Sequence, residues 1–308
     1  MEYLLKTNAL TKRYGRHEAV SRVSLHVRQG DIYGLIGRNG AGKTTILKMI
    51  SGLAAPTEGD FSLFGYSGKA AKQVLHRVGT LIENPGIYPN LTAAENLRLK
   101  CIAMGVRNSK EMISSLLKIV GLSDTGRKRA GKFSLGMKQR LGIALALVGE
   151  PDLVVLDEPI NGLDPQGIAE IREAIEKLNR EQGITFIISS HILEELSKMA
   201  TSYGIVHNGT LLQELTREAL LQKCSERIEL KVDDTARACT VLEKMGIHEY
   251  KVVDMDTIQI FERLEDSGEI TVQLAQNGIK TMSITVKNEA LEDYYLNLTG
   301  GAQNDKLD

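Results

Sequence analysis

Eight consecutive residues have the types and the spacing that bind phosphate. Residues 37–44 read GRNGAGKT, which fits GxxxxGK followed by Ser or Thr, between a strand-like run at 31–36 and a helix-like run at 44–53. The glycines let backbone N–H groups point into one concave nest, and the helix aims its positive end at the same point. Lys43 would reach the β- and γ-phosphates of ATP, and the Thr44 hydroxyl would bind Mg²⁺. The predicted nucleotide-binding residues are Gly37, Asn39, Gly40, Ala41, Gly42, Lys43, Thr44 and Thr45.

Two other interpretations of this loop explain less. An ordinary glycine-rich turn between a strand and a helix would leave the adjacent Lys43 and Thr44 without a role. A dinucleotide-binding loop of the pattern GxGxxG requires a spacing that Gly34, Gly37 and Gly40 do not have. The phosphate-binding interpretation is therefore favoured.

Two adjacent carboxylates and one histidine follow other apolar runs. The run LVVL at 153–156 leads into Asp157 and Glu158, at the carboxyl end of a predicted parallel strand, where open α/β sheets bind ligands. Asp157 could hold Mg²⁺ through water, and Glu158 could polarise the water that attacks the γ-phosphate. His191 follows the run at 184–190, so we expect it at the same edge, where it could touch the γ-phosphate and sense hydrolysis. The alternatives are a solvated turn for the acids and an ordinary surface or core position for His191.

A serine and a glycine open a further predicted helix and could form a second anion site. Ser134 can cap the helix that continues through Leu141, and Gly136 would let a phosphate approach the helix end closely. One chain cannot easily bring this helix end and the loop at 37–44 onto the same phosphate. Two copies that face each other head to tail could do so, each completing the pocket of the other. The alternative for Ser134 is a plain helix cap.

The elements that must position these residues form an α/β sandwich. The runs 31–37, 153–157 and 184–190 are short, β-rich and unalternating, as expected of parallel strands that are buried on both faces. Each run leads toward a helical stretch, which indicates alternating strands and helices. The segment 2–27 alternates in short stretches and predicts strands of an antiparallel sheet.

A mostly helical insert is predicted over about residues 92–145. Thr92 and Glu95 have capping-box spacing before a helix over roughly 93–104. The apolar face of another helix comprises Met112, Ile113, Leu116, Leu117 and Val120. Both helix faces indicate packing. We therefore expect the functional residues of this region in the loops that join the insert to the sheet.

A second domain is predicted to begin at about residue 218 and to continue to 308. Its expected order is strand 226–232, helix 234–245, strand 249–254, strand 257–261, helix 265–276, strand 279–285 and a last helix that contains LEDYYLNL. This βαββαβ order is typical of a small ferredoxin-like α+β domain. Because its sequence offers no glycine-rich loop, metal cluster or catalytic pair, we expect a packing or regulatory role.

The composition narrows the class of protein. The 308 residues include 38 basic and 39 acidic ones, well mixed, so we expect no binding to nucleic acid. Cys101, Cys224 and Cys239 lie far apart and lack metal-ligand spacing, which indicates reduced cytosolic thiols. No apolar run reaches the length of about 18 residues that a membrane span requires, so we expect a cytoplasmic protein.

Together these motifs, in this order, resemble the ATPase subunit of an ATP-binding cassette (ABC) transporter over about residues 2–217. The resemblance implies a P-loop NTPase cassette with antiparallel β and helical subdomains, followed by the α+β accessory domain. It also implies that Tyr14 stacks on adenine, although Tyr14 could equally pack on the sheet. Ser134 and Gly136 resemble the family signature, and His191 resembles its switch histidine. The resemblance further assigns a D-loop to Gly162, Leu163 and Asp164.

The chain departs from the family pattern at two places. The signature usually reads LSGGQ, whereas here Leu135 and Met137 replace Gly and Gln, which changes the geometry offered across a dimer. Glu83 stands where the family has a glutamine that contacts Mg²⁺ and links to the membrane subunit; a carboxylate is also a hard oxygen ligand for Mg²⁺. The alternative for Glu83 is a solvated loop acid. This exchange, with the ending LEDYYLNLTGG, resembles the subgroup of bacitracin resistance and lantibiotic immunity.

The resemblance implies a cytoplasmic motor subunit at the inner face of the membrane. Two copies would bind MgATP, close, drive a separate permease, hydrolyse ATP and reopen, and the subgroup suggests export of a membrane-active peptide. One alternative is a soluble ABC ATPase that acts on ribosomes or DNA. It is disfavoured because the chain has one cassette, no sustained heptad run and no basic tract. Another alternative is a nucleotide sensor whose altered signature makes hydrolysis vestigial.

Overall fold

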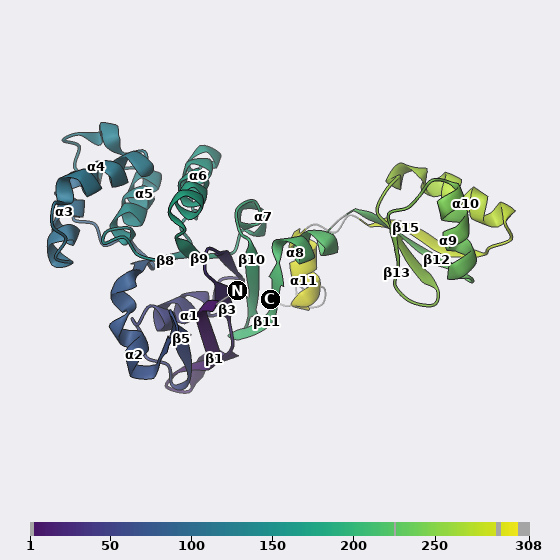
Figure 1. Cartoon of the computed structure of the whole chain (residues 1–308), viewed down its shortest axis with the longest axis horizontal. Coiled ribbons are helices and arrows are strands. Elements are labelled where there is room, and N and C mark those ends of the chain that lie inside the picture. Colours follow the sequence, from purple (N-terminus) through teal and green to yellow (C-terminus); the bar gives the residue numbers. More distant parts are fainter. Residues whose placement is uncertain (1–2, 225, 288–290, 301–308) are drawn as a thin grey trace, which may run out of the picture. The chain divides into compact units, whose positions relative to one another are not determined.

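The structure, a computed structural model, describes residues 3–224, 226–287 and 291–300. The chain divides into two compact units, of residues 1–217 and 218–308. The first unit contains two β-sheets and the helices α1 to α7, and the second contains a four-stranded sheet with α9 and α10 beside it (Figure 1). The candidate site residues all belong to the first unit.

A six-stranded sheet contains the buried runs of the sequence. Its order is β11-β10-β4-β9-β8-β7, in which β11 is antiparallel to β10 and all other neighbours are parallel. Every residue of β4, β8 and β9 is buried, which confirms that the unalternating runs are strands covered on both faces. The bounds are Ile32–Ile36 for β4, Val78–Leu81 for β7, Leu153–Asp157 for β8, Thr185–Ser190 for β9, Ser202–His207 for β10 and Thr210–Thr216 for β11.

The N-terminal segment forms the predicted antiparallel sheet, in the order β2-β1-β5-β6 with β3 also paired to β1. Its strands are Tyr3–Tyr14 (β1), His17–Val23 (β2), His26–Arg28 (β3), Glu58–Leu63 (β5) and Tyr66–Ser67 (β6). One apolar core joins this sheet, α1 (Lys43–Ile50) and the parallel sheet. It includes Leu5, Leu10, Val20, Ile46, Leu47, Met49, Leu63, Leu153, Val155 and Ile187. This core holds α1 at the edge of the parallel sheet.

The predicted helical insert consists of α3, α4 and α5, which contact one another and lie together in Figure 1. The capping box before α3 is confirmed: the Thr92 side chain accepts from the Glu95 N–H, and the Glu95 side chain accepts from the Thr92 N–H. Ile113, Leu116 and Val120 of the predicted second face are buried. The helices of this unit are Gly68–Gln73 (α2), Ala93–Ala103 (α3), Ser109–Ile119 (α4), Leu135–Ala146 (α5), Pro165–Gln182 (α6) and Leu193–Ser197 (α7).

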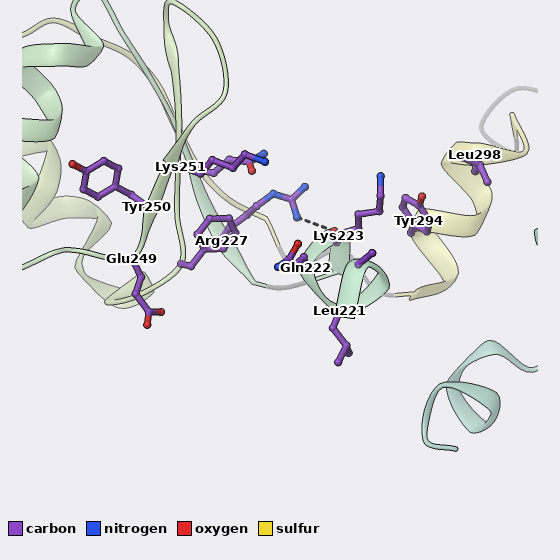
Figure 2. A pocket seen from close by; sticks show the side chains of 12 residues that line it. Leu221, Gln222, Lys223, Arg227, Glu249, Tyr250, Lys251, Tyr294 and Leu298 are labelled. Carbon is purple, nitrogen blue, oxygen red and sulfur yellow. Dashed lines mark hydrogen bonds between the residues drawn. The ribbon is translucent and has the colours of Figure 1, made fainter. Parts of the chain in front are cut away.

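The second unit has the predicted βαββαβ order and a core of its own. Its sheet order β13-β14-β12-β15 is antiparallel throughout, as in a ferredoxin-like domain. The bounds are Arg217–Cys224 (α8), Arg227–Val232 (β12), Thr235–Lys244 (α9), Tyr250–Val252 (β13), Thr257–Ile260 (β14), Ser267–Gln276 (α10), Thr281–Lys287 (β15) and Leu291–Leu298 (α11). A hollow of about 1120 Å³ is lined by residues of α8, the sheet and α11 (Figure 2). It contains none of the candidate site residues.

Two features are absent from the described residues. Among the helices of that part of the chain, none combines the length and the apolar character that a membrane span needs. Within the same residues, no group of three or more His, Cys, Asp and Glu side chains is arranged to hold a metal ion.

Candidate active site

The predicted phosphate loop lies between β4 and α1, and its shape requires glycine at two positions. A Cβ atom on Gly37 would lie 2.5 Å from the Val206 carbonyl oxygen, and one on Gly42 would lie 2.7 Å from the Ala19 carbonyl oxygen. Gly42 also has φ 101°, a backbone conformation that other residues rarely adopt. As the N-cap of α1, Gly42 has no side chain to compete for the first N–H groups of the helix. Those groups remain available for an anion.

The Lys43 side chain connects this loop to the predicted catalytic glutamate. It is only 5% exposed, and its Nζ donates to the Gly37 carbonyl oxygen at 2.6 Å and to the Arg38 carbonyl oxygen at 3.2 Å. Nζ also forms an ion pair with Glu158 Oε1 at 3.1 Å. A buried ammonium held by oxygens in this way is oriented toward the loop interior, where phosphate oxygens would bind.

Asp157 binds both a residue of α1 and a residue of the neighbouring strand. Thr44 Oγ1 donates to Asp157 Oδ2 at 2.8 Å, and Ser189 Oγ donates to Oδ1 at 2.6 Å. The parallel register of β8 and β9 pairs Asp157 with Ser189, which explains why the two side chains meet. Ser189 was not among the predicted site residues. Its signal in the sequence is that it is one of two adjacent serines that end the apolar run of β9, just before His191.

Glu158 and His191 meet at the same sheet edge, as their positions after β8 and β9 predicted. His191 Nδ1 lies 2.7 Å from Glu158 Oε2, within hydrogen-bond distance. The Glu158 backbone has φ 49° and is held there in part by its N–H, which donates to Ser189 Oγ at 2.9 Å. Left-handed backbone at a glutamate is unfavourable, and such residues concentrate at functional sites. Although Glu158 Oε1 forms an ion pair with Lys43, this buried oxygen accepts no hydrogen bond from the described residues.

The signature residues lie in a different hollow, together with the predicted D-loop. Ser134 caps α5, because its Oγ accepts from the Met137 N–H at 3.3 Å. Asp164 caps α6 in the same way, through the Gly167 N–H at 3.1 Å. These helix ends line a hollow of about 430 Å³ together with Leu135, Gly136, Gly162 and Leu163. No residue of the phosphate loop lines this hollow.

Tyr14 and Glu83 lie at the margin of the site. Tyr14 is half exposed at the end of β1, with Lys12 Nζ 5.1 Å from its ring centroid. Glu83 has φ 64° and forms an ion pair with Lys48 of α1. Lys48 Nζ donates a hydrogen bond to Glu83 Oε1. This hydrogen bond raises the pKa of Lys48 above its ordinary value, and the negative charges of Glu83 and Asp157 add to the effect. Glu83 therefore contacts Lys48, a residue that is not among the predicted site residues.

Fold and site together define a nucleotide-hydrolysing P-loop cassette. A family model described as ABC transporter matches residues 20–161. The chain is 44% identical over 303 residues to the bacitracin transport ATP-binding protein BcrA of Bacillus licheniformis, covering 98% of this chain and 99% of that protein. It is 42% identical over 211 residues to the lantibiotic transport ATP-binding protein SrtF of Streptococcus pyogenes, covering 68% of this chain and 90% of that protein. The chain belongs to the ABC transporter family as an ATP-binding, ATP-hydrolysing subunit.

Solved structures agree with this assignment. An ATP-binding subunit of an ABC transporter shares 31% identity with a TM-score of 0.63, over 71% of this chain and 92% of that chain. A dimeric post-hydrolysis state of an ATP-binding cassette, bound to ADP and Pi, shares 25% identity with a TM-score of 0.63, over 69% of this chain and 98% of that chain. These matches confirm the expected cassette fold.

Proposed function

We propose that the chain works as one of a pair of ATP-driven cassettes that power export of a membrane-active peptide through a separate permease. The observation that carries the proposal is the convergence of five side chains at one sheet edge: Lys43, Thr44, Asp157, Glu158 and His191. The relatives support the class of substrate, because their names specify bacitracin and lantibiotic transport.

ATP would bind with its phosphates in the loop at 37–44 and its adenine against Tyr14. The N–H groups of the loop and of the first turn of α1 would bind the phosphate oxygens. Lys43 would exchange its contacts with carbonyl oxygens for contacts with the β- and γ-phosphates. Its ion pair with Glu158 keeps the ammonium and the catalytic carboxylate on the same side of the nucleotide.

The side chains beside the loop fit Mg²⁺. The Thr44 hydroxyl and the Asp157 carboxylate supply hard oxygen donors, and they already lie 2.8 Å apart. Ser189 orients Asp157 through its other carboxylate oxygen. Glu83 is the further carboxylate assigned to this ion. When bound, Mg²⁺ would offset the negative charge on the phosphate oxygens.

Glu158 would act as the general base for hydrolysis, and His191 would orient it. Once Lys43 turns to the phosphates, Glu158 Oε1 would be released to accept a proton from water, while the contact of Oε2 with His191 fixes the plane of the carboxylate. His191 would contact Glu158 Oε2 through Nδ1, which leaves its other ring nitrogen for the γ-phosphate. That nitrogen would have to carry a proton to donate to a phosphate oxygen.

A second copy of the chain would supply what this site lacks. The hollow that contains Ser134 and Gly136 offers the capped end of α5 to a phosphate of the other copy. Leu135, which is 51% exposed in this hollow, would then pack at the contact between the copies. Dimerisation would therefore complete two sites at once, with nucleotide at both.

An apolar groove in the first unit would bind the permease. A hollow of about 360 Å³ is lined by residues of α3, α5 and the loop that follows β7. Its rim has large exposed apolar side chains, among them Leu53, Tyr88 and Leu99. Exposed apolar side chains around a hollow mark protein contacts, and a short amphipathic helix fits such a groove. Because Glu83 lies in the same loop, motion of the permease could reach the metal site directly.

Purification of the tagged chain from detergent-treated membranes tests the proposal. We expect a multispanning protein to copurify, and ATP hydrolysis by this complex to rise when bacitracin or a lantibiotic is added. Copurified ribosomal proteins in its place would contradict the transporter assignment. A complex that binds MgATP without measurable hydrolysis would instead indicate a nucleotide sensor.

Two matched variants test the groove. Leu99→Lys should abolish copurification of the permease while ATP binding is preserved, because Leu99 is 41% exposed on α3 and is not near the phosphate loop. Val272→Lys changes an apolar residue of similar exposure, 48%, on α10 of the second unit. It should leave copurification unchanged. Equal loss with both variants would show that the permease does not bind in the groove.

A further inference from the structure

The ion pair between Lys48 and Glu83 lies beside the predicted metal ligands. Lys48 follows Thr44 by four residues in α1, so the two side chains are neighbours on one face of the helix. Glu83 follows β7, whose Leu81 pairs with Leu156, the residue that precedes Asp157. The register of β7 and β8 therefore brings the Glu83 loop to the same sheet edge as Asp157.

The backbone at Glu83 indicates that this position is constrained. Its φ of 64° lies in the left-handed region, which glutamate seldom occupies. The Glu83 side chain is 60% exposed and that of Lys48 is 31% exposed, so neither residue is required for the core. Exposed ion pairs stabilise proteins little, and stability alone does not explain a strained residue that forms one.

Without a cation beside it, Glu83 would repel a nucleotide. Asp157 and Glu158 already place two carboxylates at this edge of the sheet, and ATP adds a strongly negative triphosphate. If Glu83 were unpaired, it would add a third negative charge and would oppose ATP binding, most strongly when no metal ion is present. The ammonium of Lys48 is a hydrogen-bonded counter-charge for it.

We propose that Lys48 is a positioning residue for Glu83: it neutralises the Glu83 carboxylate until Mg²⁺ arrives and thereby sets how strongly ATP binding depends on Mg²⁺. Lys48 acts through Glu83 and not by contact with phosphate. This inference rests on the proposed function, because it requires ATP to bind at the loop 37–44.

Calorimetric titration with ATP, in EDTA and in excess Mg²⁺, tests the proposal on the full chain. Lys48→Gln should weaken metal-free ATP binding about two- to fivefold, the range expected for loss of one exposed ion pair, and Mg²⁺ should restore most of the affinity. Glu83→Gln should not weaken metal-free binding. The double variant Lys48→Gln with Glu83→Gln should bind like Glu83→Gln alone, and Lys48→Arg should retain the affinity of the unchanged chain.

The control is Lys287→Gln, which breaks another partly exposed lysine–glutamate pair, with Glu229 in the second unit. It should leave ATP binding unchanged. If Lys48→Gln weakens binding as much in the Glu83→Gln background as alone, Lys48 contacts the nucleotide directly and the proposal is wrong. An equal loss in EDTA and in Mg²⁺ would also overturn it. If the unchanged chain failed to bind MgATP, the proposed function would be wrong as well. Binding by the unchanged chain therefore distinguishes failure of this inference from failure of the proposed function.

Discussion

Glu158 combines a strained backbone, an ion pair and a carboxylate oxygen that is still able to accept a hydrogen bond. Each property alone has a structural explanation, but a residue that serves stability would not need an unfavourable φ of 49°. Ser189 contributes to this geometry from the next strand, because its hydroxyl binds both Asp157 and the Glu158 backbone. One serine thus contacts both the proposed metal ligand and the backbone of the proposed general base.

Replacing Glu158 by Gln should separate hydrolysis from binding. The amide keeps the size of the side chain but cannot take a proton from water, so we expect phosphate release to fall at least about a hundredfold. ATP affinity should be retained or increased, since one negative charge near the phosphates is lost. Single-turnover hydrolysis and equilibrium ATP binding measure the two effects.

The chain offers a matched control in Glu150. It is an exposed glutamate that also has a left-handed backbone, with φ 54°, but it lies before β8. Glu150→Gln should leave hydrolysis unchanged. Rapid turnover by Glu158→Gln would remove Glu158 from the proposed role.

At the scale of elements, the sequence predicted strands and helices well where one local pattern determined them. The run LVVLD at 153–157 forms β8 with the predicted bounds. Four consecutive apolar residues that end in an aspartate are typical of a parallel strand that is buried on both faces. The capping box at Thr92 was predictable for a similar reason, since both partners lie within four residues.

Contacts between elements could not be predicted in this way. The pairing of Asp157 with Ser189 follows from the register of β8 and β9, which no single segment encodes. The contact of Lys48 with Glu83 likewise depends on how α1 lies against the loop after β7. The order of the strands and the positions of β10 and β11 also emerged only from the structure. The sequence therefore predicted which residues lie at this sheet edge, but not which neighbours orient them.

The cap of α3 makes a testable contribution to local stability. Thr92→Ala removes the hydroxyl that accepts from the Glu95 N–H, so we expect α3 to lose about 1 kcal/mol of local stability. Amide hydrogen exchange of residues 93–103 measures this loss, which corresponds to exchange about five times faster. Ser67→Ala is the control, because Ser67 is the N-cap of α2 but makes no side-chain hydrogen bond there. Exchange in α2 of this variant should change less than exchange in α3 of Thr92→Ala.

The same cap should depend on pH. Hydrogen bonds from the Thr92 backbone N–H and hydroxyl hold the pKa of Glu95 below its ordinary value of 4.5. A carboxylate with a lowered pKa stabilises the folded state above its ordinary pKa, and this stabilisation is lost as the pH falls through the lowered value. The difference in exchange between Thr92→Ala and the unchanged chain should therefore shrink as the pH falls below the ordinary pKa of 4.5 and through the lowered pKa of Glu95. A difference that grows with acid would contradict this account of the cap.

At the scale of the whole molecule, each unit has an apolar core. Among the described residues, the core of the second unit has buried members from Ile228 to Ile279. The phosphate loop, the predicted metal ligands and the signature all belong to the first unit. ATP should therefore stabilise only the first unit, and damage to the second core should leave ATP binding intact.

Calorimetric melting tests this independence. At ATP concentrations about a hundredfold above the Kd, MgATP should stabilise the first unit by about 2.7 kcal/mol and raise one transition only. Leu230→Ala truncates a fully buried side chain of β12. It should reduce the free energy of unfolding of the second unit by about 2–5 kcal/mol and lower the melting temperature of the other transition, without changing ATP affinity. Leu63→Ala, equally buried in β5, should lower the transition that responds to ATP. A single transition that moves with both ligand and Leu230→Ala would show that the units unfold together, and the second domain would then influence the nucleotide site through stability.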